Sequence, residues 1–135
     1  MKIDRPFFDT NVLLYLLSGD TRKADRAEAV IATGGVISVQ VLNEFASVAS
    51  RKLRMSYIEI RDALQIIRVV CQTQPITVDT HERGLDIAER FGFSLYDSMI
   101  VSSALESGCS VLYSEDMRHG QEIDTQLVIA NPFLN

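Results

Sequence analysis

Four acidic residues of this 135-residue sequence lie at positions where a carboxylate is costly unless it has a partner. Asp9 and Asp116 each follow an expected apolar strand, and Glu44 and Asp97 each lie on the apolar stripe of an expected helix. Hard oxygen ligands without His or Cys select Mg²⁺ or Mn²⁺. Such an ion orients a water, lowers its pKa and offsets charge on a phosphate group. The four acids therefore suggest metal-assisted hydrolysis of phosphodiester bonds.

Glu44 departs most clearly from the pattern expected of a surface acid. It lies three residues after Val41 and four before Val48, and these two residues and Phe45 mark the inward stripe of the helix. An unpaired ionised carboxylate facing the core would protonate or destabilise the fold. The ordinary alternatives are an ion pair with Arg51, two helical turns later, or a position at the edge of the apolar stripe.

The other three acids also have ordinary alternatives. Asp9 could cap the helix that follows it, Asp97 is favoured by the dipole at a helix N-terminus, and Asp116 could be a turn residue. However, ligands collect at the carboxyl ends of the strands in an open parallel sheet. Acids gathered at one edge raise one another's pKa unless a cation joins them. Their expected convergence favours a shared cation.

Short apolar strands separated by helices must position these residues. The sequence predicts strands over residues 5–9, 36–39, 76–79, 109–114 and 126–130. It predicts helices over residues 11–17, 21–33, 39–53, 57–72, 80–92 and 95–107. Asp20 or Thr21, Ser38 and Ser56 are the expected helix starts. This alternation indicates right-handed crossovers, a mainly parallel twisted sheet and an α/β fold of three layers, in one domain over residues 1–135.

Composition excludes several classes of protein. With 47% hydrophobic residues and only 7 Gly and 3 Pro, the chain is neither disordered nor collagen-like. No apolar run is long enough for a membrane helix, and the N-terminus lacks the pattern of a signal peptide. We therefore expect a soluble, cytoplasmic protein. Cys71 and Cys109 each lie in an apolar stretch and are expected to be buried thiols.

The net charge of −5 argues at first against a nucleic-acid partner, but the charge is uneven. Residues 1–78 carry 10 bases and 8 acids, whereas residues 79–135 carry 3 bases and 10 acids. The densest basic cluster, Arg51, Lys52 and Arg54, ends the third helix. It either complements the helix dipole or contacts phosphate groups. A bound divalent ion would also reduce the charge of the acidic site.

Four segments of the sequence resemble the acidic motifs of PIN-domain ribonucleases, in particular the VapC-like toxins of bacterial toxin–antitoxin pairs. The segments are DTNVLLYLL, QVLNEF, YDSMIVSSAL and VLYSEDMRHG, and the resemblance covers essentially the whole chain. It implies a three-layer α/β/α domain with Mg²⁺- or Mn²⁺-dependent endoribonuclease activity on RNA. It also implies a homodimer whose activity is blocked by a small antitoxin protein.

The resemblance also assigns roles to individual residues. It places Asp9, Glu44, Asp97 and Asp116 at the four catalytic, metal-binding positions. The small polar residues that orient these acids match Thr10, Asn11 and Ser114, and Glu115 is a candidate outer ligand. The chain departs from the family at Ser98, where the family often has Ala.

Other functions fit the sequence less well. A phospho-acceptor receiver domain needs a late Lys, and no Lys follows Lys52. A dehalogenase-like phosphatase needs a second Asp at the position of Asn11, and a dinucleotide-binding domain needs a Gly-rich turn there. His81 and His119 lack metal-ligand spacing. A PIN-like binding module, or a nuclease acting on DNA or in rRNA processing, remains the alternative.

Overall fold

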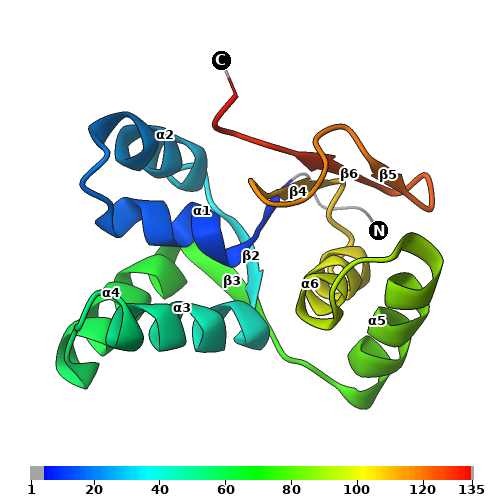
Figure 1. Cartoon of the computed structure of the whole chain (residues 1–135), viewed down its shortest axis with the longest axis horizontal. Helices are drawn as coiled ribbons and strands as arrows, with labels where there is room; N and C mark the ends of the chain where they lie inside the picture. Colours follow the sequence, from blue (N-terminus) through cyan, green and yellow to red (C-terminus); the bar gives the residue numbers. More distant parts are fainter. Residues whose placement is uncertain (1–4, 135) are drawn as a thin grey trace.

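A six-stranded sheet runs through the centre of the molecule (Figure 1). The computed structural model describes residues 5–134. The strands have the order β3-β2-β1-β4-β6-β5, and all neighbours are parallel except β5 and β6. Their bounds are β1 (Phe7–Phe8), β2 (Gly35–Ser38), β3 (Cys71–Gln74), β4 (Val111–Tyr113), β5 (Glu122–Ile123) and β6 (Leu127–Ala130).

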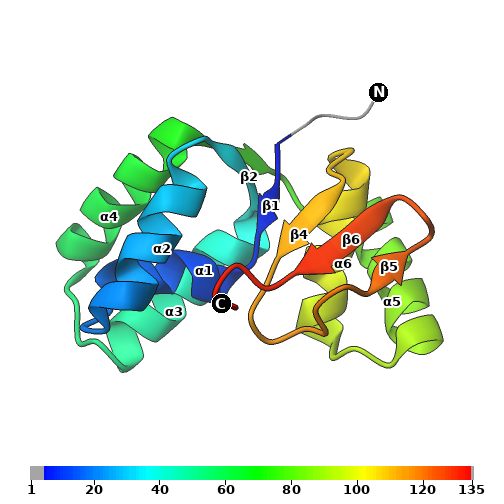
Figure 2. The ribbon, with the colours of Figure 1, turned by 90° about the horizontal axis from the view of Figure 1, so that it is seen from above.

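Helices flank this sheet, so the predicted three-layer α/β/α arrangement is confirmed. Figures 1 and 2 show α1 to α4 gathered on the side of β1 to β3, whereas α5 and α6 lie against β4 and β6. The helices are α1 (Thr10–Leu14), the 3-10 helix η1 (Tyr15–Leu17), α2 (Thr21–Ile31), α3 (Val39–Arg51), α4 (Tyr57–Val70), α5 (Val78–Phe91) and α6 (Leu95–Glu106). Within residues 5–134, none of these helices combines the length and the hydrophobicity needed to cross a membrane.

Helix α6 is the central helix of the core on its side of the sheet. Its residues Ser98–Leu105 are all buried, because the sheet covers one face and α5 covers another. Helix α5 approaches closely at Gly84, where a Cβ atom would lie only 2.6 Å from Cε of Met99. The N-terminus of α6, which carries Asp97, is therefore held firmly against the sheet.

The helix starts confirm three predicted caps. Asp20 accepts a hydrogen bond from the backbone N of Lys23, and Ser38 accepts one from the backbone N of Val41. Ser56 and Glu59 form a reciprocal capping box at the start of α4. Each side chain satisfies a backbone donor that has no partner within its helix.

The prediction of a third strand over residues 76–79 is wrong. In the structure, β3 (Cys71–Gln74) directly follows α4, which ends at Val70 instead of at residue 72. Helix α5 begins earlier than predicted, because Thr77 caps it by accepting a hydrogen bond from the backbone N of Thr80. β3 is an edge strand and only partly buried, so its sequence CQTQ has no apolar signal. The short antiparallel strand β5 was also not predicted.

Both cysteines are buried free thiols, as predicted. Burial raises the pKa of Cys71 and of Cys109 to about 11, and the nearby Arg5 only partly offsets this. Both side chains are therefore protonated at neutral pH and behave as small apolar groups of the core.

Candidate active site

The four acids come from four different elements that meet at one edge of the sheet. Asp9 directly follows β1 and is the N-cap of α1, and Asp116 lies three residues after β4. β1 and β4 are parallel neighbours, and the backbone N of Asp9 donates to the carbonyl of Tyr113 at 3.0 Å. Glu44 lies within α3, and Asp97 lies in the first turn of α6. The sheet register thus places both strand-end acids at the same edge.

Asp9 is the most buried acid of the site, with 5% of its surface exposed. Its Oδ1 accepts a hydrogen bond from the backbone N of Thr10 at 2.7 Å, and its Oδ2 accepts one from Ser114 Oγ at 2.8 Å. The pKa of Asp9 is nevertheless raised to about 6, mainly by burial and also by the charges of Asp97 and Glu44, because these effects outweigh the two hydrogen bonds. Among residues 5–134, no ion pair compensates the ionised form of Asp9.

Glu44 and Asp97 are half-buried, and burial is the main reason that the pKa of each is raised. The charge of Asp97 also raises the pKa of Glu44, and the charge of Asp116 raises the pKa of Asp97. All four acids thus belong to one set of mutually repelling charges. Gln40, one helical turn before Glu44, donates to Glu44 Oε2 at 2.9 Å and fixes the direction of this side chain.

The structure does not pair Glu44 with Arg51, the alternative that the sequence left open. Among residues 5–134, no ion pair joins these two side chains. Instead, Arg51 Nε donates to Ser47 Oγ at 3.0 Å. Glu44 is therefore a half-buried acid held by an amide rather than by a cation.

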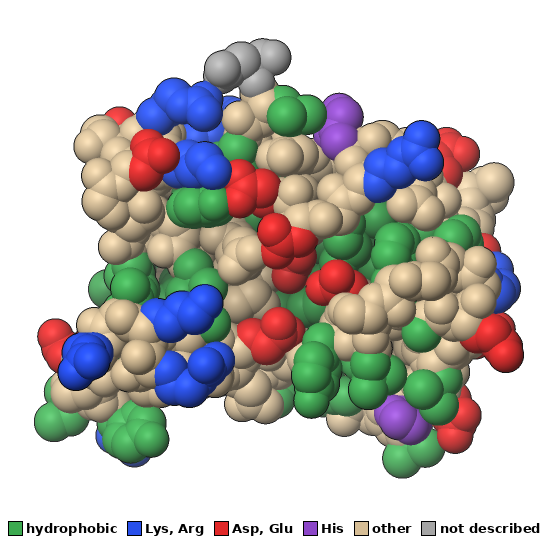
Figure 3. Space-filling model, in the orientation of Figure 1, with side chains coloured by type: hydrophobic (Ala, Val, Ile, Leu, Met, Phe, Trp, Pro, Cys, Tyr) green, Lys and Arg blue, Asp and Glu red, His purple; other side chains and the backbone are tan. Residues whose placement is uncertain are grey.

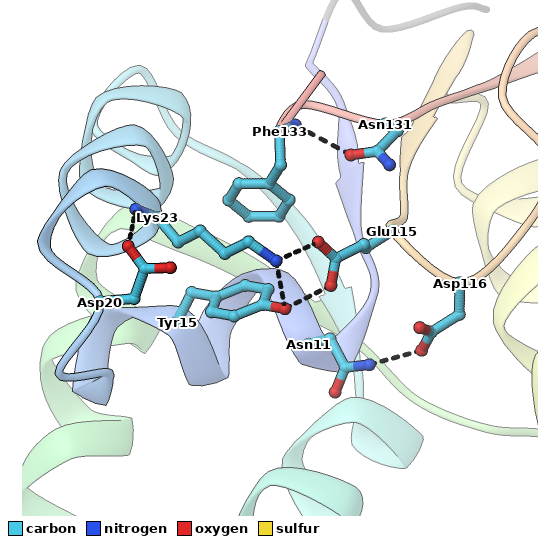
Figure 4. Close-up of polar contacts among 8 residues, drawn as sticks. All are labelled: Asn11, Tyr15, Asp20, Lys23, Glu115, Asp116, Asn131 and Phe133. Carbon is cyan, nitrogen blue, oxygen red and sulfur yellow. Dashed lines mark hydrogen bonds and ion pairs between the residues drawn. The ribbon is translucent and has the colours of Figure 1, made fainter. Parts of the chain in front are cut away.

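Asp116 is held by α1. Asn11 Nδ2 donates a hydrogen bond to Asp116 Oδ2, and Figure 4 shows the two side chains pointing toward one another. Ser114 contributes from the same loop, because its Oγ also accepts a hydrogen bond from the backbone N of Met117 at 3.3 Å. Of the residues expected to orient the acids, Asn11 and Ser114 contact acids through their side chains. Thr10 contacts Asp9 through its backbone.

Glu115 points away from Asp116 and toward α2 (Figure 4). Its carboxylate forms an ion pair with Lys23 Nζ at 2.7 Å and accepts a hydrogen bond from the hydroxyl of Tyr15. Lys23 Nζ also lies 4.7 Å from the centre of the Tyr15 ring, which packs edge-on against Phe133. We call Tyr15, Lys23 and Glu115 the clamp. It fixes the backbone on the N-terminal side of Asp116.

Loss of the clamp is expected to loosen the segment that carries Asp116. In Lys23→Met, the amides of residues 114–117 should exchange hydrogen faster than in the unaltered chain, because Glu115 loses its cation while the aliphatic stem of Lys23 is retained. Hydrogen exchange read by mass spectrometry measures this. Arg61→Met, on the distant helix α4, is the control and should leave exchange in this segment unchanged. Equal exchange in both variants would contradict the role of the clamp.

The predicted basic cluster is only partly brought to the acids. Arg51 and Glu44 line one groove of about 480 Å³, and Lys52 lines a second groove of about 500 Å³ with Asn11 and Asp116. Arg54 lies beyond the end of α3 and lines neither groove. Figure 3 shows acidic side chains in the middle of this face, with Lys and Arg side chains beside them over the α3–α4 side. Two basic side chains, those of Arg51 and Lys52, therefore lie near the acids.

The chemistry of the site fits a hard divalent cation. Its charged donors are all carboxylates, and the pKa values of Asp9, Glu44 and Asp97 are raised by burial and by neighbouring negative charges. Among residues 5–134, no ion pair supplies Asp9 with a cationic partner. The ligand set is not a closed cage. Among residues 5–134, no three His, Cys, Asp or Glu side chains form a ready group for a metal. Mg²⁺ suits such an open arrangement because it keeps several waters.

The sequence analysis did not identify Gln40 or the residues Tyr15 and Lys23 of the clamp. Gln40 could have been found, because it lies one helical turn before Glu44. The clamp could not, because it joins residues of α2 and η1 to a residue about 100 positions away, and nothing in local spacing signals that contact.

Several solved structures resemble this chain in fold. A toxin–antitoxin complex from Klebsiella pneumoniae superposes with a TM-score of 0.72 at 20% identity, covering 94% of this chain and 97% of the other. VapC20 of Mycobacterium tuberculosis is described as a sarcin–ricin loop cleaving toxin. It superposes with a TM-score of 0.67 at 24% identity, covering 82% of this chain and 89% of the other. DNA-bound VapBC of Salmonella typhimurium superposes with a TM-score of 0.66 at 17% identity, covering 96% of this chain and 99% of the other.

These likenesses to solved structures establish the fold. A search of curated protein sequences gave no significant match. The sequence model of the PIN domain, however, matches residues 7–121, a span that contains all four acids of the site. The chain therefore belongs to the PIN domain family.

Proposed function

We propose that this chain is a Mg²⁺- or Mn²⁺-dependent endoribonuclease and the toxin of a cytoplasmic toxin–antitoxin pair. The observation that carries the proposal is the convergence of Asp9, Glu44, Asp97 and Asp116, whose charges interact and which take part in no ion pair with a Lys or Arg among residues 5–134. Membership of the PIN family and the toxins among the similar structures support a nuclease. RNA as the substrate rests on the motif resemblance.

In the proposed mechanism, Asp9 and Asp97 would hold the cation, and Glu44 and Asp116 would complete its site. When bound, the ion supplies Lewis-acid stabilisation of the phosphate and lowers the pKa of a water. The residues of the chain hold the carboxylates in fixed positions. Ser114 and the Thr10 amide fix both oxygens of Asp9, Gln40 fixes Glu44, and Asn11 fixes Asp116. Preorganisation of this kind avoids rearrangement during the reaction.

The basic residues of α3 provide the electrostatic attraction for the substrate in this proposal. Arg51 lines the groove that contains Glu44, Lys52 lines the groove that contains Asp116, and both residues bind phosphate groups of the substrate next to the acids. Arg54 contributes at longer range, since it lies just beyond the end of the same helix. Together with a bound cation, these residues offset the chain's net charge of −5.

Partner binding is the second part of the proposal. Helix α4 exposes Ile58, Ile66 and Val69, each with at least 70% of its surface accessible. Beside them, an apolar groove is lined by Leu16, Leu17, Phe45, Ala63, Ile66 and Ile67. We propose that an antitoxin helix occupies this surface and that the chain forms a homodimer. Light scattering coupled to size-exclusion chromatography tests the homodimer, and a strict monomer at high concentration would contradict it.

An RNA cleavage assay tests the proposed activity. A structured RNA should be cut in the presence of Mg²⁺ or Mn²⁺ and left intact in EDTA, because without the ion no Lewis acid stabilises the charge on the phosphate or lowers the pKa of a water. A DNA of the same sequence serves as the comparison. Undiminished cleavage in EDTA would rule out the metal mechanism, and cleavage of DNA alone would favour the alternative of a DNA nuclease.

A further inference from the structure

An exposed aromatic residue borders the acidic site. Tyr96 directly precedes Asp97 at the start of α6, and 62% of its surface is exposed. It lines the groove of about 480 Å³ together with Gln40, Asn43, Glu44, Ser47, Val48 and Arg51 of α3. Figure 3 shows hydrophobic side chains beside the acidic ones on this side of the face. An aromatic ring thus lies next to two of the four acids without being part of the core.

The wall of the groove opposite Tyr96 carries unused polar groups. The Nε of Arg51 donates to Ser47 Oγ, which orients the guanidinium and leaves its terminal nitrogens without a partner within residues 5–134. In the same described part of the chain, the side-chain amide of Asn43 makes no hydrogen bond. Both groups come from α3, so they face the groove from one rigid helix.

These three groups match the base and the phosphate of a nucleotide. An exposed aromatic ring stacks on an unpaired base, a guanidinium binds a phosphate, and an amide both donates to and accepts from the edge of a base. The volume of the groove lies within the range of small-molecule sites. A duplex would keep its bases paired and stacked, so these groups favour a strand or loop with an unstacked base.

We propose that this groove is a subsite for one unstacked nucleobase next to the cleaved phosphodiester bond. Tyr96 stacks on the base, Asn43 contacts its edge, and Arg51 binds the adjoining phosphate. The subsite assigns Tyr96, Asn43 and Arg51 to recognition of the nucleotide beside the acids. The inference rests on the proposed nuclease function and deepens it, because it names the residues that position one nucleotide of the substrate.

Binding of short RNA tests the subsite without depending on catalysis. A fluorescein-labelled single-stranded RNA octamer is titrated with protein in EDTA at low salt, and fluorescence anisotropy gives its affinity. Tyr96→Ala should bind it roughly 10-fold more weakly, whereas Tyr96→Phe, which retains the ring, should bind like the unaltered chain. Tyr57→Ala is the matched control, because Tyr57 is also an exposed tyrosine at the start of a helix, with 71% of its surface accessible.

A set of octamers with one abasic position each locates the stacked base. The unaltered chain should lose affinity at one abasic position, and Tyr96→Ala should lose this dependence. Equal affinity of Tyr96→Ala and the unaltered chain, or an equal loss in Tyr57→Ala, would overturn the subsite. If the unaltered chain cleaves RNA while Tyr96→Ala binds normally, only the subsite fails. If the unaltered chain neither binds nor cleaves RNA, the proposed function fails as well.

Discussion

Asp9→Asn is expected to lower RNA cleavage by roughly 100-fold or more while leaving the fold intact. Loss of groups that only support a metal ligand costs ~10- to 100-fold, and Asp9 is proposed to hold the ion itself. The substitution keeps the shape of the side chain. Its carbonyl oxygen can still accept from the backbone N of Thr10, and an Asn is as good an N-cap for α1 as an Asp. Initial cleavage rates in Mg²⁺ measure the effect.

A matched control distinguishes loss of the site from loss of charge. Asp62→Asn removes the same charge from an exposed position on helix α4, which carries none of the four acids, and should leave the cleavage rate unchanged. Circular dichroism and the melting temperature establish that Asp9→Asn is folded. Cleavage by a folded Asp9→Asn at the rate of the unaltered chain would show that Asp9 takes no part in the reaction.

The same substitution should stabilise the metal-free protein, and the gain should depend on pH. The pKa of Asp9 is raised from 3.8 to about 6, so the folded state disfavours its ionised form. This penalty is absent well below pH 4, where Asp9 is protonated in both states, grows between about pH 4 and pH 6, and stays constant at higher pH. The difference corresponds to about 3 kcal/mol at pH 7. Melting temperatures in EDTA should therefore favour Asp9→Asn at pH 7 and not at pH 4.

Addition of Mg²⁺ at pH 7 should make the unaltered chain more stable than Asp9→Asn. A ligand that binds only the folded state raises its stability, and the ion also compensates the charges that burial penalises. At pH 7, millimolar Mg²⁺ should raise the melting temperature of the unaltered chain and leave Asp9→Asn almost unchanged. Glu115 and Asp124 have lowered pKa values and respond to pH in the opposite sense, so the difference between the two proteins is the quantity to compare. An unchanged melting temperature in both proteins would contradict a clustered cation site.

The positions of the four acids could be predicted because each of them breaks a local pattern. Glu44 interrupts an apolar stripe, and Asp9 follows a fully buried strand, so hydrophobic periodicity alone singles them out. The same periodicity predicted most strands and helices together with their caps. It failed at β3, because a polar edge strand has no such pattern. In the parts of the fold where burial determines the sequence, prediction and structure agree.

Contacts between distant segments could not be predicted in this way. Glu115 was expected to be a candidate outer ligand, since it adjoins Asp116 in the sequence. In the structure, it pairs with Lys23 and Tyr15 instead, and both of these contacts depend on how α2 and η1 pack against the loop after β4. Likewise, the groove beside Tyr96 exists only because α3 and α6 lie side by side. Local spacing identifies residues whose side chains could take part in chemistry, and tertiary packing decides what those side chains contact.

Titration with Mn²⁺, followed by electron paramagnetic resonance of the free ion, tests most directly whether the four carboxylates form one cation site. The unaltered chain should bind Mn²⁺, and Asp9→Asn, Glu44→Gln, Asp97→Asn and Asp116→Asn should each weaken binding by roughly 10-fold or more. Asp62→Asn should bind like the unaltered chain. If Asp9→Asn and Asp97→Asn bind Mn²⁺ as tightly as the unaltered chain does, the four acids do not share an ion, and the proposed metal-dependent nuclease is contradicted.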